Sequence, residues 1–231
     1  MPKPTPEQVQ LELEETRATL PILAEMTELF TDPKMFRSFG RFSKAGFSLV
    51  QHAPNKMMTG RHKRVKGYLF KKYNDDRRAD DQLLNYMRRV EGARLIRRFI
   101  AERGFRLVTA PRKWLYELPA TFQSRYLVVA EKVDLISKLD TFRLYARIRE
   151  EQMHELATML YYFRGLNSTA SNLPYTDDGK IAFIDLERWY SNKDLLHHIG
   201  DVLPADRRAE AKRLFKELKR QGAQSFKSSF K

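Results

Sequence analysis

The sequence predicts an α+β fold, in which a small antiparallel sheet with one long helix is followed by a reduced, mainly helical half. Short runs rich in β-branched and aromatic residues alternate with proline- or glycine-bounded breaks, and longer runs place apolar residues three and four apart. A Thr-Asp-Asp-Gly turn sequence then separates two short apolar runs. We expect a helical extension over residues 1–35, the sheet and its helix over 36–133, and the helical half with a hairpin over 134–231.

Composition fits a folded chain with a strong basic bias. The 231 residues are 42% hydrophobic, which suffices for one or two small cores. The absence of cysteine excludes a disulfide framework and cysteine metal ligands. No apolar run is long enough to span a bilayer, and the first residues lack the apolar core of a secretory signal. We therefore expect a cytoplasmic protein without a transmembrane segment, and leave open export without a cleavable signal.

The first half of the chain yields its elements in a clear order. Residues 6–31 predict one amphipathic helix, and residues 65–73 have the apolar and aromatic character of a strand. Residues 80–103 follow the helical period, and Gly104 stands where that helix should stop. Three further apolar runs predict strands, at residues 105–111, 113–119 and 125–133. The last of these runs is the richest in β-branched residues.

The second half is helical apart from one hairpin. Residues 144–163 predict a long helix, and residues 204–221 predict another. Between them, Asn172 precedes a short strand, Asp-Asp-Gly turns the chain, and an apolar strand ends at Asp185. The hairpin therefore places an amide and a carboxylate at its two ends.

This segment resembles the catalytic loop and metal-binding strand of protein-kinase-like folds, in which an Asn and the Asp of Asp-Phe-Gly hold Mg²⁺. The resemblance implies a two-lobed fold that binds ATP and Mg²⁺ between its lobes, with Asn172 and Asp185 as metal ligands and Asp185 also catalytic. It covers roughly residues 47–190 and is most specific over 165–187.

The upstream elements extend the resemblance. Lys71 on the first predicted strand matches the phosphate-binding lysine, although a slip of one residue would put Lys72 on that face instead. Glu91 on the long helix matches the glutamate that pairs with this lysine. The last predicted strand enters the hinge between the lobes, where the backbone near Glu131 and Val133 would lie against the adenine.

Two departures from the family's pattern affect the expected activity. Asn167 stands where a kinase has its catalytic Asp, so it could position an acceptor but could not act as a strong base. Leu186 and Glu187 replace the Phe and Gly that follow the metal-binding Asp, and Glu187 is either a second ligand or substitute base, or the ion-pair partner of Arg188. The sequence thus predicts a slow or atypical phosphotransferase, with an inactive pseudokinase that serves as an interaction module as the alternative.

The net charge of +14 supports a further alternative. Such a basic chain could bind nucleic acid, an anionic membrane or an acidic protein. No known nucleic-acid-binding motif is present, and the same charges could simply form solvated faces.

Overall fold

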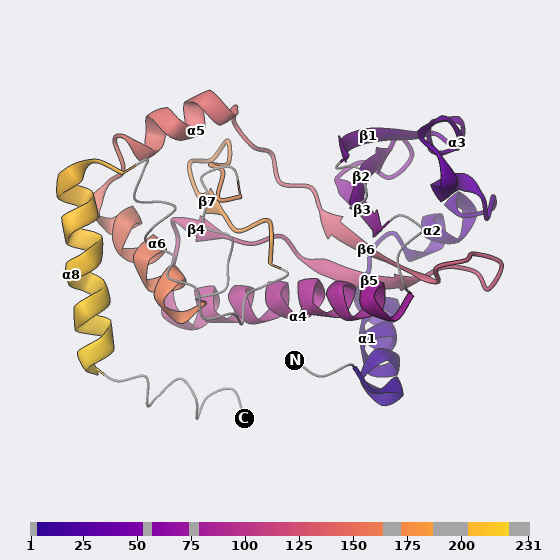
Figure 1. The fold of residues 1–231 in the computed structure, drawn as a ribbon, viewed down its shortest axis with the longest axis horizontal. Helices are drawn as coiled ribbons and strands as arrows, with labels where there is room; N and C mark the ends of the chain where they lie inside the picture. Colours follow the sequence, from indigo (N-terminus) through magenta and orange to yellow (C-terminus); the bar gives the residue numbers. More distant parts are fainter. Residues whose placement is uncertain (1–3, 53–56, 74–78, 164–171, 187–202, 222–231) are drawn as a thin grey trace. The chain divides into compact units, whose positions relative to one another are not determined.

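The computed structural model describes residues 4–52, 57–73, 79–163, 172–186 and 203–221. The chain divides into two compact units (Figure 1). The first comprises Met1–Arg94 and Pro111–Lys132, and the second comprises Leu95–Ala110 and Val133–Lys231. Each unit is described by itself below.

The first unit is built on a five-stranded antiparallel sheet with the strand order β1-β2-β3-β6-β5. The strands have these bounds: β1 Phe47–His52, β2 Met57–His62, β3 Tyr68–Tyr73, β5 Lys113–Glu117 and β6 Tyr126–Glu131. The expected α+β class with a small antiparallel sheet is confirmed, as are the strands expected within 65–73, 113–119 and 125–133.

One face of this sheet carries an aromatic cluster. Short helices supply part of it: α2 (Leu23–Leu29), the 3₁₀ turn η1 (Met35–Arg37) and α3 (Phe39–Lys44). Phe30 lies at its centre and is 2% exposed. We define the aromatic cluster by its rings: Phe30, Phe36, Phe42, Phe47, Phe70, Trp114, Tyr116 and Phe122. Residues at the start of the chain are therefore part of this unit's core.

The prediction of a single helix over residues 6–31 is wrong, because the structure contains two helices there. α1 (Pro6–Thr19) ends at Leu20, whose backbone is extended, with φ −78° and ψ 110°. The next residue is Pro21, and a residue before proline is pushed out of the helical region. α2 then starts in a new direction, so α1 and α2 can cover different faces of the sheet.

The other face of the sheet packs against α1 and α4 (Ala79–Arg103). Tyr73 and Tyr86 contact each other with ring centroids 5.3 Å apart, and the Tyr73 N–H donates a 2.7 Å hydrogen bond to the Tyr86 hydroxyl oxygen. The predicted helix over 80–103 is confirmed, and it ends at Gly104, which has φ +64°. We call the buried residues of this face the helix-facing cluster: Val9, Leu13, Tyr73, Tyr86, Val90, Leu115 and Val128.

The second unit combines helices with a small parallel pair of strands. Its helices are α5 (Lys138–Tyr145), α6 (Glu150–Tyr162) and α8 (Ala205–Gln221). Strand β4 (Val108–Thr109) pairs in parallel with β7 (Ile181–Ala182). α8 agrees with the helix expected over 204–221, but the helix expected over 144–163 is interrupted, because Arg149 has extended backbone at φ −75° and ψ 155° before α6 begins. None of the described helices combines the length and the apolar character needed to cross a membrane.

Candidate functional site

The predicted hairpin is present, and its turn is closed by side chains as well as backbone. The Ala182 N–H donates to the Pro174 carbonyl at 2.8 Å, and the Thr176 N–H donates to the Lys180 carbonyl at 2.8 Å. The Lys180 N–H returns a 2.9 Å bond to Thr176 Oγ1. Gly179 has φ +79°, a backbone conformation that suits glycine. The Asp-Asp-Gly sequence therefore does turn the chain.

A buried polar network holds this hairpin on α5 and α6. The Tyr145 hydroxyl donates to the Leu173 carbonyl at 2.7 Å. Gln152 donates from Nε2 to the Gly179 carbonyl at 2.9 Å, and its Oε1 accepts a 3.1 Å bond from the Tyr175 hydroxyl. Burial raises the pKa of Tyr145 well above its ordinary value, so this hydroxyl stays a donor. The first arm and the turn of the hairpin are thus fixed by directional bonds.

Backbone pairing fixes the returning arm from its other side. The Ile181 N–H donates to the Leu107 carbonyl at 2.9 Å, and the Phe183 N–H donates to the Thr109 carbonyl at 2.8 Å. The Glu155 carboxylate in turn accepts the Leu107 N–H at 2.8 Å. Residues 181–183, which lead to Asp185, are therefore held by the first arm of the hairpin on one side and by β4 on the other.

Asn172 and Asp185 flank the paired part of the hairpin. Its register pairs Tyr175 with Ile181, and the Ala182 N–H donates to the Pro174 carbonyl, so Asn172 lies two residues before this pairing and Asp185 three residues after it. Both side chains are partly exposed and supply hard oxygen donors of the kind that Mg²⁺ prefers. The donor chemistry of this pair fits the cation that the resemblance implies.

Two expected residues lie outside the described part of the chain, namely Asn167 and Glu187. Within the described residues, no group of three or more His, Asp or Glu side chains is arranged to hold a metal ion. A magnesium site of the kinase type does not need such a group, because substrate phosphates and water complete its coordination.

The sheet register separates the two candidate lysines. Lys72 is 1% exposed and lies on the aromatic face, with Nζ 5.1 Å from the centre of the Phe36 ring. Lys71 is paired with Val128, a member of the helix-facing cluster. Because side chains alternate along a strand, Lys71 lies on the same side of the sheet as α4 and Lys72 on the opposite side. Only Lys71 therefore shares a face with the helix that carries Glu91.

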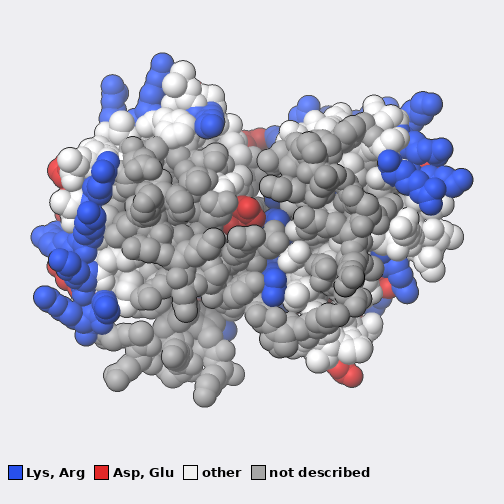
Figure 2. Space-filling view, viewed as in Figure 1, with Lys and Arg blue, Asp and Glu red and all other residues white. Residues whose placement is uncertain are grey.

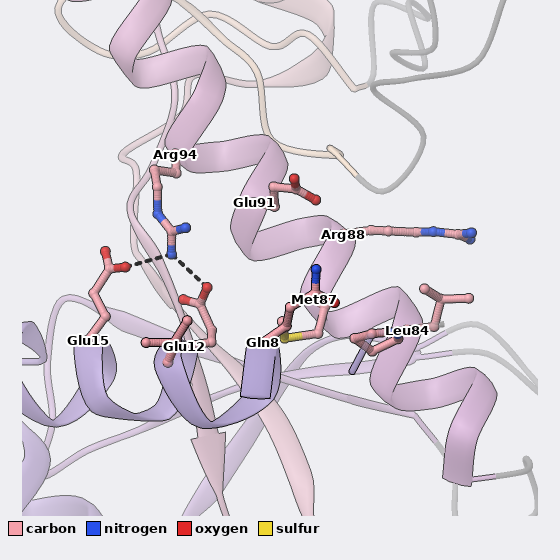
Figure 3. A pocket seen from close by; sticks show the side chains of 10 residues that line it. Gln8, Glu12, Glu15, Leu84, Met87, Arg88, Glu91 and Arg94 are labelled. Carbon is pink, nitrogen blue, oxygen red and sulfur yellow. Dashed lines mark hydrogen bonds and ion pairs between the residues drawn. The ribbon is translucent and has the colours of Figure 1, made fainter. Parts of the chain in front are cut away.

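Glu91 lines a hollow of about 270 Å³ between α1 and α4 (Figure 3). From the same helix, the Arg94 guanidinium reaches across to α1 and binds the carboxylates of Glu12 at 2.6 Å and Glu15 at 2.8 Å. Burial raises the pKa of Glu91, an effect that Arg94 reduces and Glu12 increases. An ion pair between Glu91 and Lys71 is not among those found within the described residues, so the charged neighbours of Glu91 come from α1 and α4.

The sequence did not reveal this hollow. Glu12 lies on one face of α1 and is 7% exposed, and burial raises its pKa although Arg94 hydrogen-bonds to it. The pairing of α1 with α4 depends on tertiary packing over some eighty residues, and the only sequence signal is an acidic row on α1 opposite an arginine on α4.

Glu131 is the last residue of β6, and Val133 lies two residues beyond it. The Arg112 N–H donates to the Glu131 carboxylate at 2.9 Å, and the Glu131 N–H donates to the Arg112 carbonyl at 3.0 Å. The Lys132 N–H donates to the Gly67 carbonyl at 2.7 Å. Val133 is the first residue of the second unit after β6. Among the hydrogen bonds of the described residues, none uses the Val133 backbone, whereas the N–H groups of both residues before it are engaged.

No protein-family model matches this chain, and comparison with curated proteins finds no match.

Proposed function

We propose that the chain binds ATP with Mg²⁺ and is a kinase-like protein, active as a slow or atypical phosphotransferase. The observation that carries the proposal is the hairpin flanked by Asn172 and Asp185, which is held by the network of Tyr145, Gln152 and Tyr175. A metal site needs ligands fixed in position by their surroundings. A hairpin bound on both arms supplies that rigidity.

The order of the other elements supports the same function. Lys71 lies on the third strand of an antiparallel sheet, and the next element is the long helix α4 with Glu91. Protein kinases likewise carry their phosphate-binding lysine on the third strand and its glutamate on the following helix. The face shared by Lys71 and α4 agrees with this role, and Glu91 would have to leave the hollow on α1 to pair with Lys71.

Each residue has a distinct task in the proposed site. Lys71 would bind phosphate oxygens, and Asn172 and Asp185 would hold Mg²⁺, which neutralises charge on the phosphates. The Val133 backbone would hydrogen-bond the adenine edge. Asn167 would orient an acceptor hydroxyl through its amide, without taking its proton.

Calorimetric titration with ATP, with and without Mg²⁺, tests the proposal. We expect Mg²⁺-dependent binding that is lost in Asp185→Ala and retained in Asp177→Ala, a matched control in which an exposed carboxylate is removed from the turn of the same hairpin. Circular dichroism melting of both variants checks that the fold is kept. Equal binding by the native chain and Asp185→Ala would contradict the proposed site.

The second candidate is a pseudokinase that binds nucleotide without turnover. Two features favour it: Asn167 cannot serve as a general base, and Glu91 lines the hollow between α1 and α4. A general base typically contributes about 100- to 10,000-fold to a rate. Release of phosphate or ADP from bound ATP, measured in single-turnover experiments and abolished in Asp185→Ala, would identify the enzyme. Mg²⁺-dependent binding with no turnover in the native chain would identify the pseudokinase.

A further inference from the structure

Helix α8 (Ala205–Gln221) in the second unit carries a continuous basic face. Its exposed cations recur at helical spacing, three and four residues apart. Figure 2 shows Lys and Arg side chains along the edge of the molecule where Figure 1 places α8. We call the exposed set the basic stripe: Lys212, Arg213, Lys216, Lys219 and Arg220.

The acidic residues of α8 lie apart from the basic stripe. Asp206, Glu210 and Glu217 follow one another on the other side of the helix, and Arg207 binds Glu210 at 2.7 Å. Arg213, at the margin of the stripe, lies 3.9 Å from Glu217. None of the other four cations of the stripe takes part in an ion pair within the part of the chain that the structure describes. The stripe is therefore a row of largely uncompensated positive charge.

The apolar side of α8 is already in use. Ala211 and Leu218 are buried, and Phe215 packs edge-on against Tyr161 of α6 with ring centroids 5.8 Å apart. A helix that lies in a membrane surface needs such an apolar face for the lipid. Outside the stripe, the exposed residues in the described part of α8 are two alanines, Ala205 and Ala209, and the acidic Asp206 and Glu217. Within these described residues, the exposed side of α8 can therefore bind a partner through charge but has no apolar surface for lipid.

We propose that the basic stripe of α8 binds the phosphate backbone of duplex DNA. From Lys212 to Arg220 the basic stripe extends about 12 Å, at 1.5 Å per residue. A helix about 10–12 Å across fits the major groove of DNA, which is about 12 Å wide. Cations at both margins of a convex face can then reach the phosphates of both strands, whereas a flat membrane meets only the crest of that face. We assign the cations of the stripe to phosphate oxygens, which carry no sequence information, so we expect binding that is independent of sequence.

A salt titration of binding to a labelled 20-base-pair DNA duplex, followed by fluorescence anisotropy, tests this inference. The variant changes four cations of the stripe: Lys212→Gln, Lys216→Gln, Lys219→Gln and Arg220→Gln. Gln has a helix propensity close to that of Lys and Arg, so α8 should be retained, which circular dichroism can check. The matched control removes four exposed lysines of the first unit, and hence the same charge: Lys34→Gln, Lys44→Gln, Lys63→Gln and Lys66→Gln.

The native chain should bind the duplex with an affinity that falls steeply as salt rises. If all four cations contact phosphates, the slope of log K against log salt should become shallower by about 3.6 in the α8 variant, at about 0.9 for each contact. The control should keep the native slope. An equal loss in both variants would show an effect of net charge alone and overturn the inference. So would the absence of duplex binding at low salt, including the case in which vesicles of phosphatidylserine and phosphatidylcholine bind through α8 instead.

Discussion

The aromatic cluster of the first unit and the hairpin of the second unit both have buried residues at their centre, but different interactions fix them. Phe30 contacts five other rings, with centroid distances between 5.6 and 6.4 Å, and no hydrogen bond contributes to these contacts. The hairpin instead depends on directional bonds from Tyr145, Gln152 and Tyr175. Apolar packing stabilises the folded state strongly but tolerates small displacements of the side chains. A network of hydrogen bonds instead defines where each bonded group lies. The candidate metal ligands lie on the hairpin, whose position is fixed by directional hydrogen bonds.

Truncation at the centre of the aromatic cluster should have the largest effect on stability. Phe30→Ala removes a ring that is 2% exposed and leaves a cavity among five others, so we expect a loss of about 3–5 kcal/mol in the free energy of unfolding. Urea unfolding followed by circular dichroism measures it. Leu139→Ala, at a position 60% exposed on α5, is the control and should change stability by less than about 0.5 kcal/mol. A loss below 1 kcal/mol for Phe30→Ala would mean that this cluster is not the core of the unit.

Removal of one hydroxyl should test the hairpin network. Tyr145→Phe keeps the buried ring and leaves the Leu173 carbonyl without this donor, so we expect a loss of about 1–3 kcal/mol. The control is Tyr68→Phe, because the Tyr68 hydroxyl makes no hydrogen bond to any described residue, and its stability should stay close to the native value. If the two variants unfold at the same urea concentration, the bond to Leu173 contributes nothing and the contrast between the two units fails.

Alanine substitutions at two glycines, one in each unit, test whether the hairpin turn depends on its backbone conformation. At Gly179 an added Cβ meets no atom within 4 Å, but φ is +79°, so Gly179→Ala should cost about 1 kcal/mol through the backbone alone. Gly40 also has open space around it and lies in α3 without a positive φ, so Gly40→Ala should stabilise by about 0.5 kcal/mol. Thermal unfolding should therefore shift in opposite directions. A shift in the same direction for both would show that the turn does not require glycine.

The elements that the sequence predicted well are those with a strong local period. The helix over 80–103 ends at the expected Gly104, and the β-branched run over 125–133 became β6. Pro21 carried a usable signal for the break between α1 and α2, since it forces the residue before it to be extended. The break before α6 carried none, because no Gly or Pro marks residues 146–149.

The candidate site was only partly predictable, because its side chains depend on register and on distant packing. The sequence favoured Lys71 and left Lys72 open in case the register slips by one residue, and the pairing of Lys71 with Val128 assigns the two lysines to opposite faces. Asn172 and Asp185 were expected at the two ends of a hairpin, since the turn between them has a local signature. The neighbours of Glu91 could not be expected, because they come from α1, whose position is set by tertiary contacts.

Glu91 is a half-buried carboxylate in the hollow of the first unit, and its substitution should give the smallest effect. Burial raises the pKa of Glu91 above its ordinary value of 4.5, so the folded chain holds this proton more tightly than the unfolded chain. Stability should then fall as pH rises from the ordinary value through the raised one. Unlike the fully buried Tyr145, Glu91 is half-buried and has no hydrogen bond to any described residue, so its charged form lowers stability.

Glu91→Gln removes the charge while keeping the shape of the side chain. The variant should match the native chain near pH 3, where both side chains are neutral, and exceed it at pH 7 by less than about 1 kcal/mol, because the site is only half buried and water screens it. Burial also raises the pKa of Glu12, so part of the pH dependence should remain. Thermal unfolding across this pH range measures the difference, with Glu151→Gln at an exposed position as the control. A variant less stable than the native chain at pH 7 would show that the Glu91 carboxylate is stabilised by Arg94 more than burial disfavours it, and that the hollow favours the charged form.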